Sequence, residues 1–160
     1  MNALNAISVS VGLLVGLWCY ATLGYFEPKV MTWITFLTWA SFFAAGGGTG
    51  GLTKAIAGAF AGALVSAAVV FANGLLGGGV SGVGLVIFSG LLAVLGWALC
   101  QLSRVSVLSF IPGAFIGAAS FFGAGATLDQ KLFWVLVSIV CGAVMGYLSE
   151  RLGAALTRPA

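Results

Sequence analysis

The sequence predicts an all-α membrane protein whose six transmembrane segments form two inverted three-helix repeats with interrupted middle helices. Two observations carry this prediction. Hydrophobic residues make up 61% of the chain and charged residues only 6%, so the folded chain could not present a surface compatible with water. In addition, the stretch SFFAAG that begins at Ser41 returns as SFFGAG at Ser120, which indicates an internal repeat.

The charged residues mark the ends of the transmembrane segments, because they stand singly or in pairs between long apolar runs. The first run lacks the early basic residues of a signal peptide and is apolar over about 20 residues, so we expect it to remain as a span. Charges and helix breakers together divide the chain into six apolar segments. The expected segments are Leu4–Tyr25, Met31–Gly46, Ala55–Asn73, Val83–Leu102, Leu108–Gly125 and Leu132–Ser149.

The internal repeat becomes visible when the chain is shifted by 79 residues against itself, which aligns residues 7 to 65 with the second half without a gap. Trp18 then matches Trp97, Phe36 matches Phe115, and the two SFF blocks coincide. Matches between rare aromatic residues favour a true repeat. The alternative is that two stretches rich in Gly, Ala and Leu resemble each other through composition alone.

The repeat predicts two units, residues 1–79 and residues 80–160, within one membrane domain. Each unit has an odd number of spans, so the second must enter the bilayer from the side opposite to the first. Matching residues would face each other where the units meet, and a path for a solute would lie there. Basic residues are more frequent on the side of the N-terminus, which predicts that both termini are cytoplasmic. That side holds Lys54, Arg104, Arg151 and Arg158, and the other side holds Lys29 and Lys131.

The middle segment of each unit is expected to be interrupted. The run Met31–Gly46 is short for a hydrocarbon core of ~30 Å, and it ends in GGGTGG, Gly46–Gly51, which is not expected to be helical. In the second unit, Pro112 and Gly113 leave about 13 helical residues before Gly125. Breaks at matching places in two halves indicate a transport site, because unpaired backbone persists in a membrane only where protein or water satisfies it.

Glycines at GxxxG spacing are interpreted as sites where helix backbones touch. A chain of 16.2 kDa has little surface to shield broken helices from lipid, so we also expect a homo-oligomer, a dimer or a trimer, whose contacts use these faces. The pairs are Gly12 and Gly16, Gly58 and Gly62, Gly113 and Gly117, and Gly142 and Gly146.

The reactive residues exclude several classes of function. The chain has no histidine, and its three cysteines lack CxxC spacing, so we expect neither a metal site nor a cofactor. No group of residues predicts an activated nucleophile or a general base, so we expect no enzyme activity. The scattered basic residues form no stripe for nucleic acid. The carboxylates fall at predicted loops or helix ends, where they are interpreted as solvated surface: Glu27, Asp129 and Glu150.

The polar side chains left within the segments are hydroxyls and an amide, which suit a small uncharged cargo. They include Thr35, Thr38, Ser66, Gln101 and Ser106. One hypothesis is that the serines of the two SFF blocks line a shared path and that one Phe of each block narrows it. The alternatives are packing of the Phe side chains in the core or against lipid, and hydrogen bonds from the serines to their own helices. The candidate pore-lining residues are Ser41, Phe42, Phe43, Thr49, Ser109, Pro112, Ser120, Phe121 and Phe122.

The run LSFIPGAFIGAASFFGAG, Leu108–Gly125, together with FFAAGGGTGGLTKA, Phe42–Ala55, resembles the YcdZ-like family of small bacterial inner-membrane proteins. The resemblance covers nearly the whole chain, and the phrase LSF-[IV]-PG-x-FIGA is its most distinctive part. The turn Gly46–Gly51 departs from the family pattern, in which this turn contains Cys-Pro. The resemblance implies the bacterial inner membrane and a six-helix topology, and it supplies no substrate.

We therefore expect a multi-pass protein of the bacterial inner membrane that acts as a channel or facilitator for a small neutral polar solute, such as urea, a short amide or ammonia. One alternative is an ion-coupled secondary transporter, in which Glu27 or Asp129 would have to matter. Another is a non-transporting structural subunit of a membrane assembly. The expected partners are the lipid bilayer, the solute and further copies of the chain, with no nucleic acid.

Overall fold

The computed structural model describes residues 1–157, which are helical apart from short turns and connections. Arg158, which sequence analysis placed on the cytoplasmic side, lies outside the described residues. The elements are α1 (Ala3–Ala21), the π-helical turn η1 (Thr22–Phe26), α2 (Thr32–Ala44), α3 (Gly48–Leu75), α4 (Gly82–Gln101), the 3-10 turns η2 (Leu102–Arg104) and η3 (Ser106–Leu108), α5 (Ile111–Gly123) and α6 (Gln130–Leu156).

The helices are of two lengths. The short helices α2 and α5 have 13 residues each, about 20 Å at the α-helical rise, which is less than a hydrocarbon core of ~30 Å. Four of the six expected segments therefore have the length and composition of a span, and the two middle segments do not. The four long stretches are Ala3–Phe26, Gly48–Leu75, Gly82–Arg104 and Gln130–Leu156.

The interruptions expected inside the middle segments lie instead at the ends of α2 and α5. Pro112 occupies the first turn of α5, where its missing N–H costs no hydrogen bond. Gly46 and Gly47 form the turn after α2 with φ of 98° and 67°, values that favour glycine. The prediction that all of GGGTGG is non-helical is wrong for Gly48–Gly51, which form the first turn of α3.

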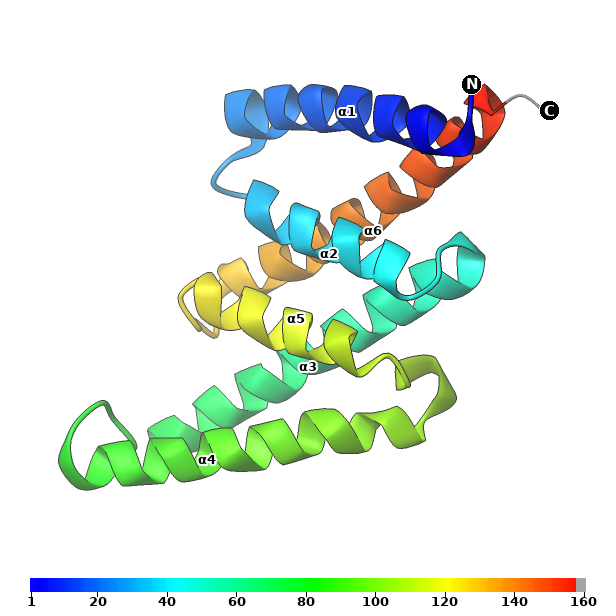
Figure 1. The fold of residues 1–160 in the computed structure, drawn as a ribbon. Coiled ribbons are helices and arrows are strands. Elements are labelled where there is room, and N and C mark those ends of the chain that lie inside the picture. The colour runs from blue at the N-terminus through cyan, green and yellow to red at the C-terminus, as the bar shows by residue number, and fades with distance from the viewer. Residues whose placement is uncertain (158–160) are drawn as a thin grey trace.

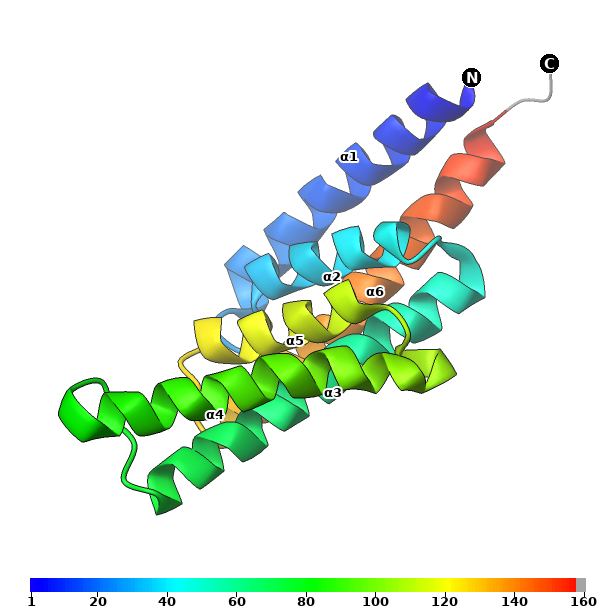
Figure 2. The ribbon, with the colours of Figure 1, turned by 60° about the horizontal axis from the view of Figure 1, so that its bottom comes forward.

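Successive helices run back and forth between two ends of the molecule, so the N-terminus and the end of α6 lie at the same end (Figure 1). Helices α1, α2, α5 and α4 lie in this order on one face, and α3 and α6 cross behind them (Figures 1 and 2). Helices α1 and α4 run in opposite directions, as do α2 and α5, and α3 and α6. The bounds of α2 and α5 are separated by the same 79 residues as the SFF blocks.

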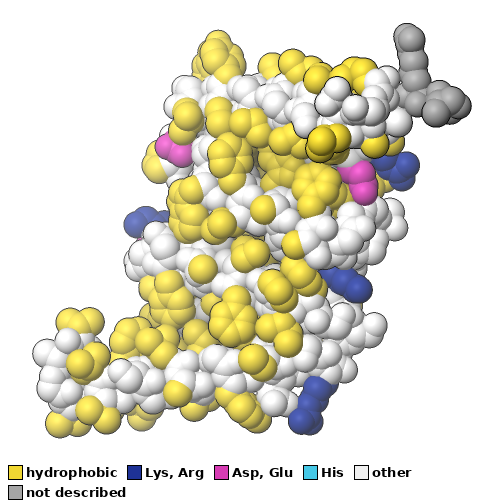
Figure 3. Space-filling view, in the orientation of Figure 1, with side chains coloured by type: hydrophobic (Ala, Val, Ile, Leu, Met, Phe, Trp, Pro, Cys, Tyr) yellow, Lys and Arg dark blue, Asp and Glu magenta, His cyan; other side chains and the backbone are white. Residues whose placement is uncertain are grey.

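The surface has the polarity that a membrane requires. On the face shown in Figure 3, the charged side chains gather at the two edges and apolar side chains cover the area between them. Helix α1 and helix α4, which flank this face, bury few residues: α1 buries Ala6 and Ser10, and α4 buries Leu95 and Leu99. Their remaining apolar side chains are available to contact lipid.

The short helix of each half packs mainly on the long helix of the other half: α2 packs on α6, and α5 packs on α3. Glycine permits both contacts. A Cβ at Gly62 would overlap the Ala114 carbonyl, and a Cβ at Gly117 would overlap the Ala59 carbonyl. Gly142 meets the backbone of α2 in the same way. These glycines therefore act within the chain, in agreement with the interpretation of GxxxG as close helix contact.

Apolar side chains fill the region where α2, α3, α5 and α6 meet. The predicted repeat places a path between the two halves in this region, and the structure has a packed cluster there instead. The high density of such cores leaves little space for a solute. The cluster consists of Ile34, Ala59, Ala63, Ala67, Phe121, Val135 and Ile139.

Candidate functional site

Helix α2 carries four buried hydroxyl side chains at intervals of three residues, which we call the hydroxyl stripe: Thr32, Thr35, Thr38 and Ser41. Their exposed fractions are 7%, 0%, 0% and 1%. An interval of three residues falls short of the 3.6-residue turn, so the stripe winds around the helix as it advances. Polar groups buried this deeply are expected to form hydrogen bonds.

At its first end the hydroxyl stripe is bonded to α1 and to the connection that follows α1. The Thr32 hydroxyl lies 2.8 Å from Thr22 Oγ1 and 3.1 Å from Glu27 Oε1. Trp18 Nε1 donates to Thr35 Oγ1 at 2.8 Å. Thr22 belongs to the π-helical turn η1, and such turns are frequent at functional sites. The stripe is thus continuous with a carboxylate at the surface.

At its second end the hydroxyl stripe has one unsatisfied group. The Thr38 hydroxyl donates to the Ile34 carbonyl at 3.0 Å, whereas Ser41 Oγ has no hydrogen-bond partner among residues 1–157. A buried hydroxyl left unpaired costs about 1–3 kcal/mol. The matching Ser120 of α5 donates to the Ile116 carbonyl at 2.8 Å. Ser41 alone of the two serines is therefore free to bind something else.

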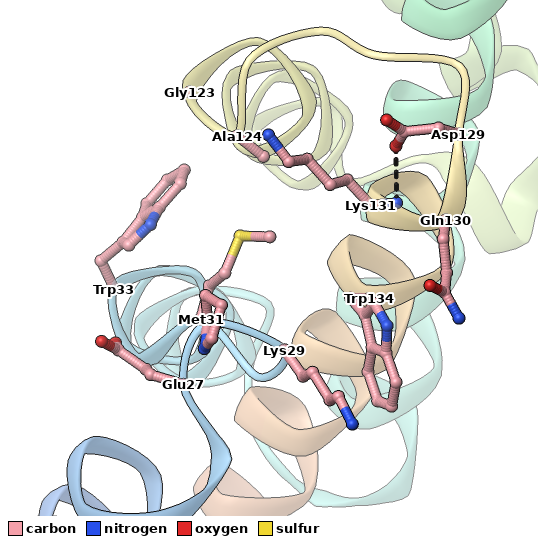
Figure 4. Close-up of a pocket in the computed structure, with 11 residues that line it drawn as sticks. Glu27, Lys29, Met31, Trp33, Gly123, Ala124, Asp129, Gln130, Lys131 and Trp134 are labelled. Atoms are coloured by element: carbon pink, nitrogen blue, oxygen red, sulfur yellow. Dashed lines mark hydrogen bonds between the residues drawn. The ribbon is translucent and has the colours of Figure 1, made fainter.

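A cavity of about 630 Å³ lies beside the first end of α2, between the α1–α2 connection and the α5–α6 connection. Figure 4 shows Met31 and Trp33 on one side of it and Trp134 on another. Four charged residues also line it: Glu27 and Lys29 from the α1–α2 connection, Asp129 at the N-cap of α6, and Lys131 in the first turn of α6. The bond from Thr32 to Glu27 joins this cavity to the hydroxyl stripe.

Besides Glu27, two of the four charged residues have structural contacts. Asp129 is the N-cap of α6 and accepts from the Lys131 backbone N–H at 2.7 Å and from the Thr127 hydroxyl at 2.9 Å. These two donors hold the pKa of Asp129 below its usual value of 3.8. The Lys29 ammonium lies 5.8 Å from the centroid of the Trp134 ring, a cation–π distance.

At the opposite end of α2, Glu150 of α6 caps α3. Glu150 Oε2 accepts the Gly48 N–H at 2.8 Å, because the N-cap residue Gly47 has no side chain to do so. The position of Glu150 at the end of an expected segment predicts that it is solvated surface. That interpretation is wrong: the residue is half-buried and bridges two long helices.

The two SFF blocks do not come together. Phe42 packs with Ala55 and Ala143, whereas Phe121 belongs to the central apolar cluster. Because α2 and α5 run in opposite directions (Figure 1), residues at matching positions lie toward opposite ends of the helix pair. Phe43 is 38% exposed, and Phe122 packs at the edge of two apolar clusters.

The remaining predicted site residues lie on the surface. Thr49 is in the first turn of α3, Ser109 precedes α5, and Pro112 is in its first turn; all three are exposed. None belongs to the hydroxyl stripe. Thr35, Thr38 and Ser41 are among the polar groups predicted from the sequence, but the three-residue interval that they share with Thr32 was not part of the prediction.

Several other residues of the site were missed. The three-residue interval of the hydroxyl stripe can be read from the sequence. The hydrogen-bond partners of α2, however, come from segments far away in the chain, which no local pattern reveals. At the second end of α2, for example, Trp39 Nε1 donates to Ser149 Oγ at 3.0 Å, and Ser149 also accepts from Ser10 through its carbonyl. The missed residues are Ser10, Trp18, Thr22, Thr32, Trp39 and Ser149.

Comparison with known proteins gives one family and several relatives. Residues 8–154 match the family model described as protein of unknown function (DUF1097). The chain is 32% identical to the uncharacterized protein YahC of Escherichia coli K12, with 99% of this chain and 98% of the relative covered. It is 34% identical to the inner membrane protein YcdZ of the same organism and 31% identical to that of Salmonella typhimurium, covering 96% of this chain and 87% and 89% of those proteins. No solved structure matches the chain.

Proposed function

The chain belongs to the DUF1097 family, and from this premise we propose that it is a multi-pass protein of the bacterial inner membrane that lets a small neutral polar solute cross along the hydroxyl stripe of α2. The names of two relatives, which call them inner membrane proteins, and the four long apolar helices support the location. The solute class is that of urea, a short amide or ammonia.

The observation that carries this proposal is the buried Ser41 hydroxyl at the end of a row of hydroxyls. Three of the four members have a partner in the protein, and Ser41 does not. A small solute with both donor and acceptor groups can exchange hydrogen bonds with such a row, whereas an ion would need charged groups or many carbonyls. The hydroxyls therefore favour an uncharged cargo.

The membrane arrangement in this proposal is an inverted repeat, with residues 1–79 and 80–160 as its units. The opposite directions of matching helices (Figure 1) and the shared 79-residue spacing of α2 and α5 support it. The basic residues Lys54, Arg104 and Arg151 belong to the end of the molecule that carries the N-terminus, which supports cytoplasmic termini.

A liposome swelling assay with urea, acetamide and ammonia tests the proposal through the matched pair Ser41→Ala and Ser120→Ala. Ser41→Ala removes an unpaired buried hydroxyl, so we expect it to raise the melting temperature while lowering the solute flux. Ser120→Ala removes only a bond within α5, so we expect unchanged flux. Wild-type flux no faster than that of empty liposomes would refute a transport function and favour a non-transporting subunit.

An ion-coupled transporter is the second candidate, because the Glu27 carboxylate is hydrogen-bonded to Thr32 at the start of the hydroxyl stripe. In that case flux would depend on an ion gradient, and Glu27→Gln would abolish the dependence. Under the channel proposal, flux persists after the gradients have been collapsed. Measuring flux with and without ionophores distinguishes the two functions.

A further inference from the structure

The charged cavity has features of a binding site that the proposed path does not use. Its walls include two indole rings and a thioether, from Trp33, Trp134 and Met31, and its rim carries charges of both signs. Asp129 is bonded within the cap of α6, and Lys29 lies against Trp134. The charged groups without these contacts are the Lys131 ammonium and the Glu27 carboxylate, which lies at the edge of the cavity and points away from Lys131 (Figure 4).

These two groups approach the cavity from different parts of the chain. Glu27 follows η1, and its Oε1 accepts from Thr32, which leaves Oε2 for another donor. Lys131 is in the first turn of α6, and its ammonium reaches across the cavity toward Ala124 (Figure 4). An anionic group at Lys131 and a cationic group at Glu27 could therefore be held by the same cavity, with an indole beside them.

The position of the cavity favours a lipid as the source of those groups. It lies at the ends of four helices, together with Trp33 and Trp134, and aromatic residues at helix ends are typical of the headgroup level of a membrane. A second, fully apolar groove of about 270 Å³ begins at Phe36, one helical turn farther along α2 than Trp33. It is lined by Val11, Val15, Phe36, Trp39, Ala40 and Phe43.

We infer that the cavity binds a zwitterionic phospholipid, with the phosphate at Lys131, the ammonium at Glu27 and an acyl chain along the groove between α1 and α2. The inference rests on the membrane location proposed above and not on the solute path. A binding assay tests it without any measurement of flux, so its failure leaves the transport proposal standing.

The test measures lipid retained by the detergent-purified protein in native mass spectrometry, with dioleoyl-phosphatidylethanolamine and dioleoyl-phosphatidylglycerol as probes. We expect Lys131→Gln to lower retention of both lipids about two- to fivefold, because both carry the phosphate. Glu27→Gln should lower retention of the ethanolamine lipid by a similar factor and leave the glycerol lipid unchanged. Lys131→Arg should restore binding.

The matched control is Arg104→Gln, which removes an exposed charge at the other end of the molecule and should leave retention of both lipids unchanged. Melting curves of each variant establish that it is folded. Equal retention of the ethanolamine lipid by the wild type, Glu27→Gln and Lys131→Gln would overturn the inference. Displacement of the lipid by free phosphoethanolamine at equal concentration would overturn the lipid assignment and assign the cavity to a soluble zwitterion.

Discussion

Helices α2 and α5 have the same length and the same SFF block at matching positions, yet their buried faces have opposite chemistry. Along α2 the inward positions carry the hydroxyl stripe, Thr32 to Ser41. The matching positions of α5 are Ile111, Ala114, Gly117 and Ser120, and the Ala and Gly among them touch the backbone of α3. Both short helices touch the backbone of their long partner, α2 where Gly142 meets Thr35 and α5 where Gly62 meets Ala114. They differ in the side chains beside these contacts.

This difference indicates that the two short helices have different roles, one in packing and the other in presenting polar groups. Helix α5 presents small side chains to α3, and its backbone contact at Gly117 tolerates no added atom. Helix α2 retains side-chain hydroxyls along nearly its whole length and therefore holds the polar groups that a solute could use. Two kinds of substitution test this difference between the helices. One loosens the close contact of α5 with α3, and the other removes polar groups from α2.

The largest effect is expected from Gly117→Val. The added atoms would overlap the Ala59 backbone, so α5 could not approach α3, and we expect a loss of about 3 kcal/mol or more. The measurement is thermal unfolding in detergent together with the fraction of monodisperse protein. Gly16→Val is the control, because Gly16 faces open space; equal melting temperatures for the two variants would contradict the close contact of α5 with α3.

Thr35→Val tests the contribution of the hydroxyl stripe of α2 to stability. It leaves the Trp18 indole N–H without its acceptor, so we expect a loss of about 2 kcal/mol of stability. In a Trp18→Phe background the same substitution should cost less by about 1 kcal/mol, because the donor is already gone. Thermal unfolding of both single variants and the double variant gives this coupling. Additive losses would show that the bond contributes nothing to stability.

The comparison extends to the first turns of the long helices. The first turn of α6 is capped by its own N-cap residue, Asp129, whereas the first turn of α3 is capped by Glu150 of α6. Glu150→Ala should therefore lower stability by about 1–2 kcal/mol, and Glu150→Gln by less, since the amide oxygen can still accept the Gly48 N–H. Melting temperatures in detergent rank the variants. A Gln variant as unstable as the Ala variant would mean that the charge, not the hydrogen bond, is what matters.

The smallest effect is expected on the stability of the folded protein at low pH. The pKa of Asp129 is depressed in the folded protein by the Lys131 N–H and the Thr127 hydroxyl. Its contribution is therefore fully present above the usual value of 3.8 and is lost as the pH falls through the lower pKa of the folded state. Melting curves from about pH 6 to about pH 3 should show this loss in the wild type. The Asp129→Asn variant keeps the cap without the titration, so its melting temperature should change less over that range.

The sequence was sufficient for the helical class, the short middle helices and the packing role of three of the four glycine pairs, because these follow from composition and local spacing. The fourth pair, Gly12 and Gly16, faces open space. The sequence was misleading at Gly48–Gly51, where glycine normally opposes helix. The carboxylate of Glu150 satisfies the first N–H of that turn, and such a long-range partner leaves no local trace in the sequence.

The candidate site was predictable only in part, because some of its features follow from local spacing and others depend on partners far away in the chain. The repeated SFF block led to the expectation that Ser41 and Ser120 face each other, but an antiparallel pair of helices separates residues at matching positions. The interval of Thr32, Thr35, Thr38 and Ser41 was visible, whereas the partners Trp18 and Thr22 depend on where α1 lies against α2. Sequence alone supplies the groups, and tertiary structure decides which of them meet.

Each short helix packs on a long helix of the other half of the chain, and this arrangement has a consequence for biosynthesis. Helix α2 leaves the ribosome early, but the helix against which it packs is the last to be made. Until α6 arrives, the Trp39 indole N–H of α2 lacks the Ser149 hydroxyl that accepts its hydrogen bond, so this part of α2 must remain in the insertion machinery or in contact with water. We expect a chain that stops after residue 79 to be digested by protease, and digestion should cease only once α6 has been completed.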